Sequence, residues 1–133
     1  METYNVSLSP YFKLSEFLIT SVPNGISSNI EHLNSDRERI ISNLLQLCKS
    51  LDKIRSFDSL PLYISSGLRS PMVNYKVGGV PTSKHQFGLA ADFVLHNQHR
   101  TKEFKLFLDS LLQSQIIQYY YFNYNKNFCH IQI

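Results

Sequence analysis

The chain is organised around the stretch Ser83-Lys84-His85-Gln86-Phe87-Gly88-Leu89-Ala90-Ala91-Asp92. It carries two residues that often bind metals, His85 in an expected loop and Asp92 on the strand that follows. Gly88 permits a tight bend that can fold His85 back toward Asp92. Ala90 shares a strand face with Asp92, because side chains alternate along a strand, and its small side chain leaves space beside the carboxylate.

Alternating and β-prone segments on both sides of this stretch predict an antiparallel sheet. The closing pair is a hairpin that places His130 near the middle of the last strand, with turn residues at 123–126. The sequence therefore predicts an α+β fold, a small antiparallel sheet packed against helices. The expected strands cover residues 60–65, 89–95, 115–122 and 127–133.

Apolar residues at helical spacing predict two amphipathic helices that wall the core. The first follows a capping box, Ser35 to Glu38, and runs for about five turns. The second is capped by Thr101. The inward residues of the first are Ile40, Ile41, Leu44, Leu45, Leu47, Cys48, Leu51 and Ile54, and those of the second are Phe104, Phe107, Leu108, Leu111 and Leu112.

The remaining segments are expected to be short or irregular. Ser15 is a candidate N-cap for a short helix start, with Phe17 and Leu18 facing inward. Residues 21–29 are rich in Ser, Asn, Pro and Gly and predict a surface loop. Residues 69–82, punctuated by proline and glycine, predict a long binding loop.

Length and charge limit the function classes. At 133 residues we expect one domain, 1–133, and a monomer. The formal net charge of +3 is mild and its residues are scattered, which argues against nucleic-acid binding. No apolar run is long enough to span a membrane. The N-terminus lacks the pattern of a secretory signal, so we expect synthesis in the cytoplasm.

Two cysteines do not make a disulfide framework. Cys48 is expected to be a buried free thiol on the first long helix, and Cys129 to point away from His130 because neighbouring strand residues face opposite sides. A zinc-ligand role for Cys129 is the alternative. Three further histidines are expected to be solvated: His32, His96 and His99.

His85, Asp92 and His130 could together hold one zinc ion. A catalytic zinc site has three protein ligands of such types and an open position for water. The alternative for each residue is a purely structural role, with each histidine hydrogen-bonded or solvated and the aspartate bonded to a neighbouring turn.

Several motifs, in order along nearly the whole chain, resemble the zinc D-Ala-D-Ala carboxypeptidase family, and its compact branch of phage and bacterial cell-wall peptidases most of all. They are Tyr11-Phe12-Lys13-Leu14-Ser15-Glu16-Phe17, Ser66-Gly67-Leu68-Arg69-Ser70-Pro71, Asn74, Val77-Gly78-Gly79, Ser83-x-His85-x-x-Gly88-x-Ala90-x-Asp92 and Phe128-Cys129-His130-Ile131.

The resemblance implies a hedgehog/DD-peptidase-like domain that uses Zn²⁺ to cleave amide bonds in peptidoglycan peptides, as a D,D-carboxypeptidase or endopeptidase. It implies action at the bacterial cell wall, after release or as a phage product. His85, Asp92 and His130 match the family's three ligands. Arg69 matches an arginine that holds the substrate or its developing oxyanion; the alternative is an arginine that pins the long loop.

Two further positions match residues placed near the substrate. Ser83 matches a serine that contacts substrate, and could equally cap the turn before His85. Gln118 is retained from a stretch that, in this branch, precedes the last strand.

The sequence departs from the family at the general base. The acidic residue expected three positions before His130 is Asn127, which cannot accept a proton at working pH. Water could be oriented by Tyr119, Tyr120 or Gln118, or an acid such as Asp109 or Glu16 could enter the site. The third explanation is a zinc-containing cell-wall-binding or structural module that has lost catalysis.

Overall fold

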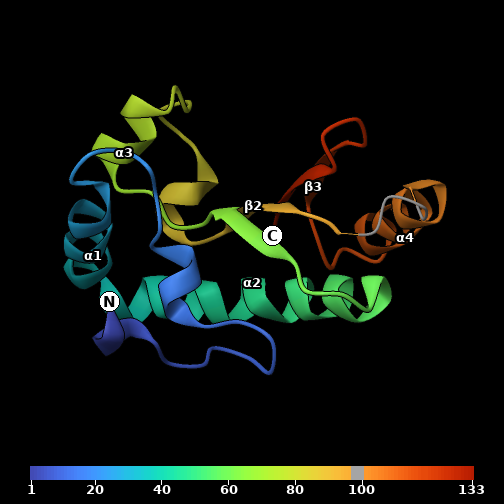
Figure 1. Cartoon of the computed structure of the whole chain (residues 1–133), viewed down its shortest axis with the longest axis horizontal. Helices are drawn as coiled ribbons and strands as arrows, with labels where there is room; N and C mark the ends of the chain where they lie inside the picture. Colours follow the sequence, from blue (N-terminus) through green and yellow to red (C-terminus); the bar gives the residue numbers. More distant parts are fainter. Residues whose placement is uncertain (97–100) are drawn as a thin grey trace.

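A computed structural model describes residues 1–96 and 101–133 as a single α+β domain (Figure 1). Its centre is a four-stranded antiparallel sheet, as the sequence predicts, and the strand order is β1-β2-β4-β3. The strands are β1 (Tyr63–Ser66), β2 (Ala90–Val94), β3 (Tyr119–Asn123) and β4 (Phe128–Gln132). The helices are α1 (Gly25–Ser35), α2 (Arg37–Asp58), α3 (Pro71–Lys76) and α4 (Thr101–Gln113), with three short 3₁₀ helices, η1 (Glu2–Tyr4), η2 (Leu14–Phe17) and η3 (Lys84–Phe87).

The two central strands separate core from site by strict alternation. Phe93 and Cys129 pair across β2 and β4 and are both fully buried in the core. Asp92 and His130 are the next pair along and lie on the opposite face. Neighbouring strand residues point to opposite sides, so the same strands contribute to both layers.

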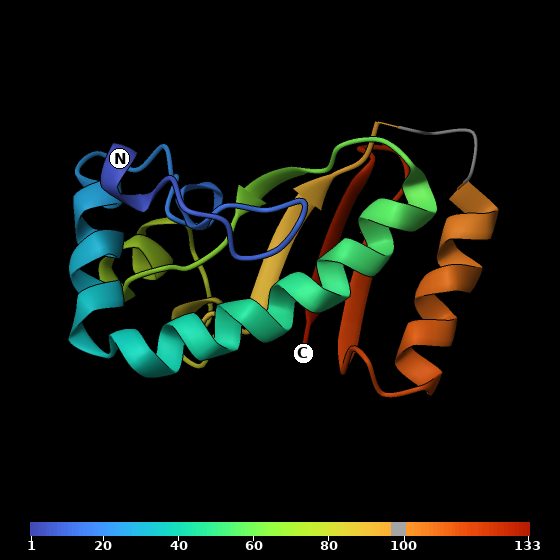
Figure 2. The ribbon, with the colours of Figure 1, turned by 90° about the horizontal axis from the view of Figure 1, so that it is seen from below.

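Helices α2 and α4 cover the core face of the sheet. Figure 2 shows α2 passing in front of the strands, with α4 beside β3. Phe104 of α4 packs edge-on against Phe122 of β3, with ring centroids 5.1 Å apart. The face that carries Asp92 is left uncovered by these helices. Of the expected inward residues, Leu112 and Leu45 are exposed, so those two assignments are wrong.

The loop expected over residues 21–29 is wrong, because helix α1 begins at Gly25. The segment resembles a loop in composition, but its polar residues form tertiary hydrogen bonds. Asn29 is fully buried, its Nδ2 donates to the Leu18 carbonyl (3.0 Å) and its Oδ1 accepts from the Ser70 N–H (2.8 Å). The helix is thus stabilised by a buried amide that periodicity cannot reveal.

The expected caps also need correction. Ser35 ends α1 and donates to the His32 carbonyl, so the N-cap of α2 is Asp36 and the capping box at Ser35 does not form. At η2 the cap is Lys13, whose backbone N–H donates to Glu16 (2.7 Å), rather than Ser15.

The long loop over residues 69–82 contains a helix that the sequence reading missed. Helix α3 starts where Ser70 accepts a hydrogen bond from the Val73 N–H (3.1 Å), with Pro71 at the first helical position. A capping serine followed by proline is a typical helix start, and the following Gly-Gly obscured it.

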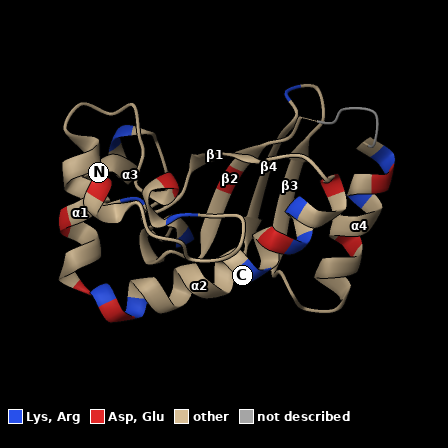
Figure 3. Cartoon of the chain, turned by 60° about the horizontal axis from the view of Figure 1, so that its bottom comes forward, with Lys and Arg blue, Asp and Glu red and all other residues tan. Residues whose placement is uncertain are grey.

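Charged residues are interspersed over the described surface. Figure 3 shows Lys and Arg alternating with Asp and Glu along α2 and α4. Within the described part of the chain, no helix combines the length and apolar character needed to cross a membrane.

Candidate metal centre

His85, Asp92 and His130 come together on the uncovered face of the sheet. One ligand-type atom from each lies within 4.8 Å of the others. The three residues line a hollow of about 370 Å³ that is open to solvent. Three segments far apart in the sequence therefore meet at one point, as the resemblance to the zinc carboxypeptidase family implies.

The bend before β2 delivers His85 to this point. Ser83 Oγ accepts from the His85 N–H (3.2 Å) and caps the short helix η3. Gly88 ends η3 with φ of +74°, in the left-handed region that favours glycine. Ser83 also lines the hollow, so it has both positions that the sequence reading considered.

The His85 ring presents one unpartnered nitrogen to the cluster. Its Nδ1 lies 2.8 Å from the Gly67 carbonyl, which can only accept, so Nδ1 carries the proton. Nε2 is buried, has no hydrogen-bond partner and lies 3.4 Å from Asp92 Oδ1. Two electron-pair donors face each other at this distance, an arrangement that a cation between them would stabilise.

Asp92 is the hub of the cluster. Its Oδ1 lies 2.5 Å from His130 Nδ1, and its Oδ2 lies 3.2 Å from Arg69 Nη2. Burial raises the pKa of Asp92, but the hydrogen bond from His130 and the contacts with both imidazoles outweigh burial, so its pKa lies well below the usual range. The carboxylate is therefore ionised, as a metal ligand must be.

This donor set fits zinc. Two imidazoles and one carboxylate are common zinc ligands, and two ligands of a tetrahedral zinc lie about 3.3 Å apart. The 3.4 Å between His85 Nε2 and Asp92 Oδ1 matches that spacing. His130 Nδ1 lies 2.5 Å from Asp92 Oδ1 and donates a hydrogen bond whose proton a metal would replace. The bond from His85 to Gly67 is the type of outer contact that fixes a ligand's tautomer.

Arg69 faces the cluster but is also tied into the loop that carries it. Its Nε donates to Ser66 Oγ (2.9 Å) and its Nη1 to Asn74 Oδ1 (3.2 Å), besides the contact with Asp92. Its backbone N–H donates to the His85 carbonyl (3.0 Å). A guanidinium has five N–H donors, so two remain for a bound molecule.

The structure does not bring Gln118 to the site. It lies just before β3, is exposed, and lines a separate hollow beside α2 with Lys49 and Gln46. Its N–H pairs with the Gln132 carbonyl (2.8 Å). Because side chains alternate along the strand, the following residue, Tyr119, points to the sheet face that carries Asp92.

Four further residues line the hollow, and of these the sequence suggested only Tyr119, as a residue that could orient water. All four side chains lie on the same face of the β3–β4 hairpin as His130, because side chains alternate along a strand. The sequence alone could have indicated this. Gln132 Nε2 lies 3.1 Å from His130 Nε2, and the Tyr119 ring packs edge-on against the His130 ring with centroids 5.9 Å apart. The four are Tyr119, Tyr121, Phe128 and Gln132.

No second carboxylate lines the hollow among the described residues. Asn127 is buried at the end of the β3–β4 turn, with φ of +54°, and its side chain donates to the Leu95 carbonyl. Asp109 accepts from the Tyr120 hydroxyl on the core side, and Glu16 caps η2. None of the three is available as a base at the cluster.

Of the other histidines, His96 is exposed as expected, and His99 lies outside the described residues. His32 is only partly exposed, and its Nε2 lies 2.6 Å from the Gln86 carbonyl, so the expectation of full solvation is wrong. It helps to fix η3. Both thiols are buried, and Cys129 points into the core, away from the cluster.

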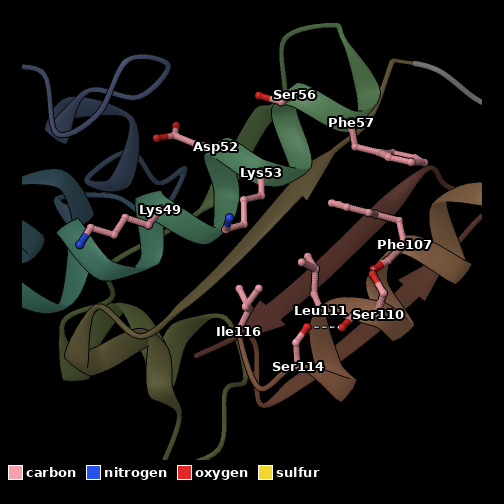
Figure 4. Close-up of a pocket in the computed structure, with 10 residues that line it drawn as sticks. All are labelled: Lys49, Asp52, Lys53, Ser56, Phe57, Phe107, Ser110, Leu111, Ser114 and Ile116. Carbon is pink, nitrogen blue, oxygen red and sulfur yellow. Dashed lines mark hydrogen bonds between the residues drawn. The ribbon is translucent and has the colours of Figure 1, made fainter.

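A larger hollow, of about 870 Å³, lies between α2 and α4 (Figure 4). Phe57 and Phe107 stack in parallel at one end, with centroids 4.3 Å apart. Ser114 donates to the Ser110 carbonyl, so its proton is used within the helix. The described residues that line it include no histidine. Their one carboxylate, Asp52, accepts a hydrogen bond from the Ser9 hydroxyl (2.8 Å). The residues that could hold a metal therefore line the smaller hollow.

Comparison with known proteins agrees with this placement. The chain matches the family described as Peptidase M15 over residues 10–132. No curated protein matches the chain. The match covers the η2 segment, the loop with Arg69, the bend with His85 and the closing hairpin. The chain therefore belongs to the M15 peptidases, the zinc D-Ala-D-Ala carboxypeptidase-like family.

Proposed function

We propose that this protein is a zinc-dependent peptidase that hydrolyses amide bonds in peptidoglycan stem peptides, as a D,D-carboxypeptidase or endopeptidase. Its family supports a metallopeptidase acting on cell-wall peptides. The observation that carries the proposal is the buried, unpartnered His85 Nε2, which faces an ionised carboxylate inside an open hollow. Such a site is suited to a metal rather than to a hydrogen bond.

In this proposal His85, Asp92 and His130 hold the metal. Zinc, when bound, polarises the scissile carbonyl and lowers the pKa of a bound water toward about 7. The two unused N–H donors of Arg69 bind the carbonyl oxygen or a carboxylate of the substrate. Ser83, which lines the same hollow, contacts the substrate. The protein acts as a single-domain monomer at the bacterial wall, after release or as a phage product.

A second function is favoured by one observation, the lack of another carboxylate among the described residues of the hollow. A zinc-containing module that binds cell-wall peptide without cleaving it would have this composition. Loss of a general base costs about 10²–10⁴-fold in rate, so the two functions differ in measurable turnover.

Digestion of purified muropeptides, followed by mass spectrometry, separates the two functions. We expect the zinc-loaded protein to release product and His85→Ala to release none, while His96→Ala, an exposed histidine away from the cluster, behaves as wild type. Metal analysis should give about one zinc per chain for wild type and much less for His85→Ala. Wild-type protein that holds zinc and binds muropeptide without releasing product would support the binding module instead.

A further inference from the structure

We propose that Tyr119 is the proton donor of this site, a role that rests on the proposed peptidase function. Hydrolysis of an amide requires a group that gives a proton to the departing nitrogen. The only carboxylate among the described residues that line the hollow is Asp92, which is already engaged with His130 and Arg69. The proton must come from another kind of side chain.

Few lining residues have a proton that they can release. A guanidinium does not deprotonate in proteins, which excludes Arg69. The hydroxyl of Ser83 and the amide of Gln132 are far weaker acids than a phenol, whose ordinary pKa is about 10. His85 and His130 are assigned to the metal in the proposed function. Among the described lining residues this leaves two tyrosines, Tyr119 and Tyr121, which are 49 % and 51 % exposed.

Position favours Tyr119. It pairs with Gln132 across the β3–β4 ladder, and its ring lies edge-on to His130, with centroids 5.9 Å apart. Gln132, the strand partner of Tyr119, also contacts His130, with 3.1 Å between the two Nε2 atoms. Tyr119 is thus held beside one of the three clustered residues. For Tyr121, which pairs directly with His130 in the register, no ring contact with that histidine is found in the described chain.

The Tyr119 hydroxyl is free to act on a ligand. Within the described part of the chain it forms no hydrogen bond, whereas the neighbouring Tyr120, on the core face, donates its proton to Asp109. Alternation therefore assigns the two tyrosines different tasks, because Tyr120 stabilises the packing of α4 and Tyr119 faces the open hollow.

The proposed step balances without another reactant. Water adds its oxygen to the carbonyl carbon, the C–N bond breaks, and its electron pair remains on nitrogen. The Tyr119 O–H gives its proton to that nitrogen, and the phenolate takes up the proton that water has lost. Before this transfer the phenol donates a hydrogen bond to the tetrahedral centre, which is where a fixed donor lowers the barrier.

Binding of a phosphinate pseudodipeptide, an anionic mimic of the tetrahedral centre, tests the contact without turnover. Calorimetry on the zinc-loaded protein should show about 10- to 100-fold weaker binding for Tyr119→Phe, the range for a hydrogen bond to a charged group. The matched control is Tyr124→Phe, an exposed tyrosine in the same hairpin outside the hollow, which should bind as wild type. Zinc content should be equal in all three proteins. Equal phosphinate binding by Tyr119→Phe and wild type would overturn the proposal.

Hydrolysis rates provide the second test. We expect kcat to fall about 10²–10⁴-fold in Tyr119→Phe with KM little changed. An active wild type with an equally active Tyr119→Phe would refute the donor role alone. A zinc-loaded wild type without hydrolysis would refute the peptidase function itself.

Discussion

At the scale of single residues, the two buried thiols make the free energy of unfolding sensitive to pH in the alkaline range. Cys48 is fully buried in α2. Burial, followed by the charges of Asp52 and Glu16, raises its pKa to about 12 from an ordinary value of 9.0. Burial raises the pKa of Cys129 as well. Both side chains are neutral hydrophobic groups in the folded protein.

We expect the free energy of unfolding to fall between about pH 9 and pH 12. A group whose pKa is raised by folding stabilises the protein fully below its unfolded pKa, and this contribution is lost as pH rises toward the folded value. The loss is up to about 1.4 kcal/mol per pH unit for each thiol. Urea titrations at several pH values measure it.

The control for this prediction is Cys48→Ala. It should lower stability by about 1 kcal/mol at pH 7, because a small cavity forms. Its stability should then fall less steeply with pH than that of wild type, since one thiol is gone. Parallel curves for the two proteins above pH 9 would contradict the assignment.

The sequence carried most of the site at this scale. The family resemblance predicted that His85, Asp92 and His130 meet, whereas strand alternation and the bend at Gly88 only allowed it. Gln118 was assigned from the family resemblance alone; in the structure it lies just before β3, which begins at Tyr119 rather than at the expected residue 115, and its side chain lines a separate hollow. Tyr119 was considered only as a residue that could orient water, and its place on the wall of the hollow follows from the β3–β4 register.

At the scale of elements, the β3–β4 hairpin shows why an acid at position 127 would not restore a general base. Asn127 is buried in the left-handed region and donates to the Leu95 carbonyl, while the Leu95 N–H donates to its carbonyl (3.0 Å). The side chain closes the turn onto the end of β2. It is not among the residues that line the metal hollow.

We therefore predict that Asn127→Asp lowers stability without raising hydrolysis. The carboxylate would face the Leu95 carbonyl and lose the amide donor, at a cost of about 2–5 kcal/mol for a buried unpaired polar group. Thermal unfolding and the muropeptide assay measure both effects. Asn125→Asp, an exposed change in the same turn, should leave both unaltered. A gain in turnover for Asn127→Asp alone would show that this position reaches the site.

Helices α1 and α3 show where sequence reasoning ends at this scale. The long helix α2 was predictable from its apolar period, and the sheet from alternation. Helix α1 depends on one buried amide, Asn29, which joins two distant backbone groups, and α3 on the Ser70 cap within a segment rich in turn residues. Tertiary hydrogen bonds outweighed local propensity in the first case, and competing turn signals hid the cap in the second.

At the scale of the whole molecule, a metal at the cluster would join the η3 bend to both central strands. We expect zinc to raise the melting temperature, because a ligand that binds only the folded state stabilises it by about 4 kcal/mol at a thousandfold excess over Kd. Chelation should reverse the gain. His96→Ala should respond as wild type, whereas His85→Ala should show almost no response. A melting temperature independent of zinc would rule out a metal at this site.

The alternation along β4 also limits how the chain can change in length. Cys129 and Ile131 belong to the core, while Phe128, His130 and Gln132 line the hollow. Inserting one residue between the turn and Phe128 would carry Cys129 into the row of Asp92 and press an imidazole into the apolar interior. Insertions and deletions over evolutionary time should therefore be confined to the turn itself, where they leave the pairing of β2 with β4 intact.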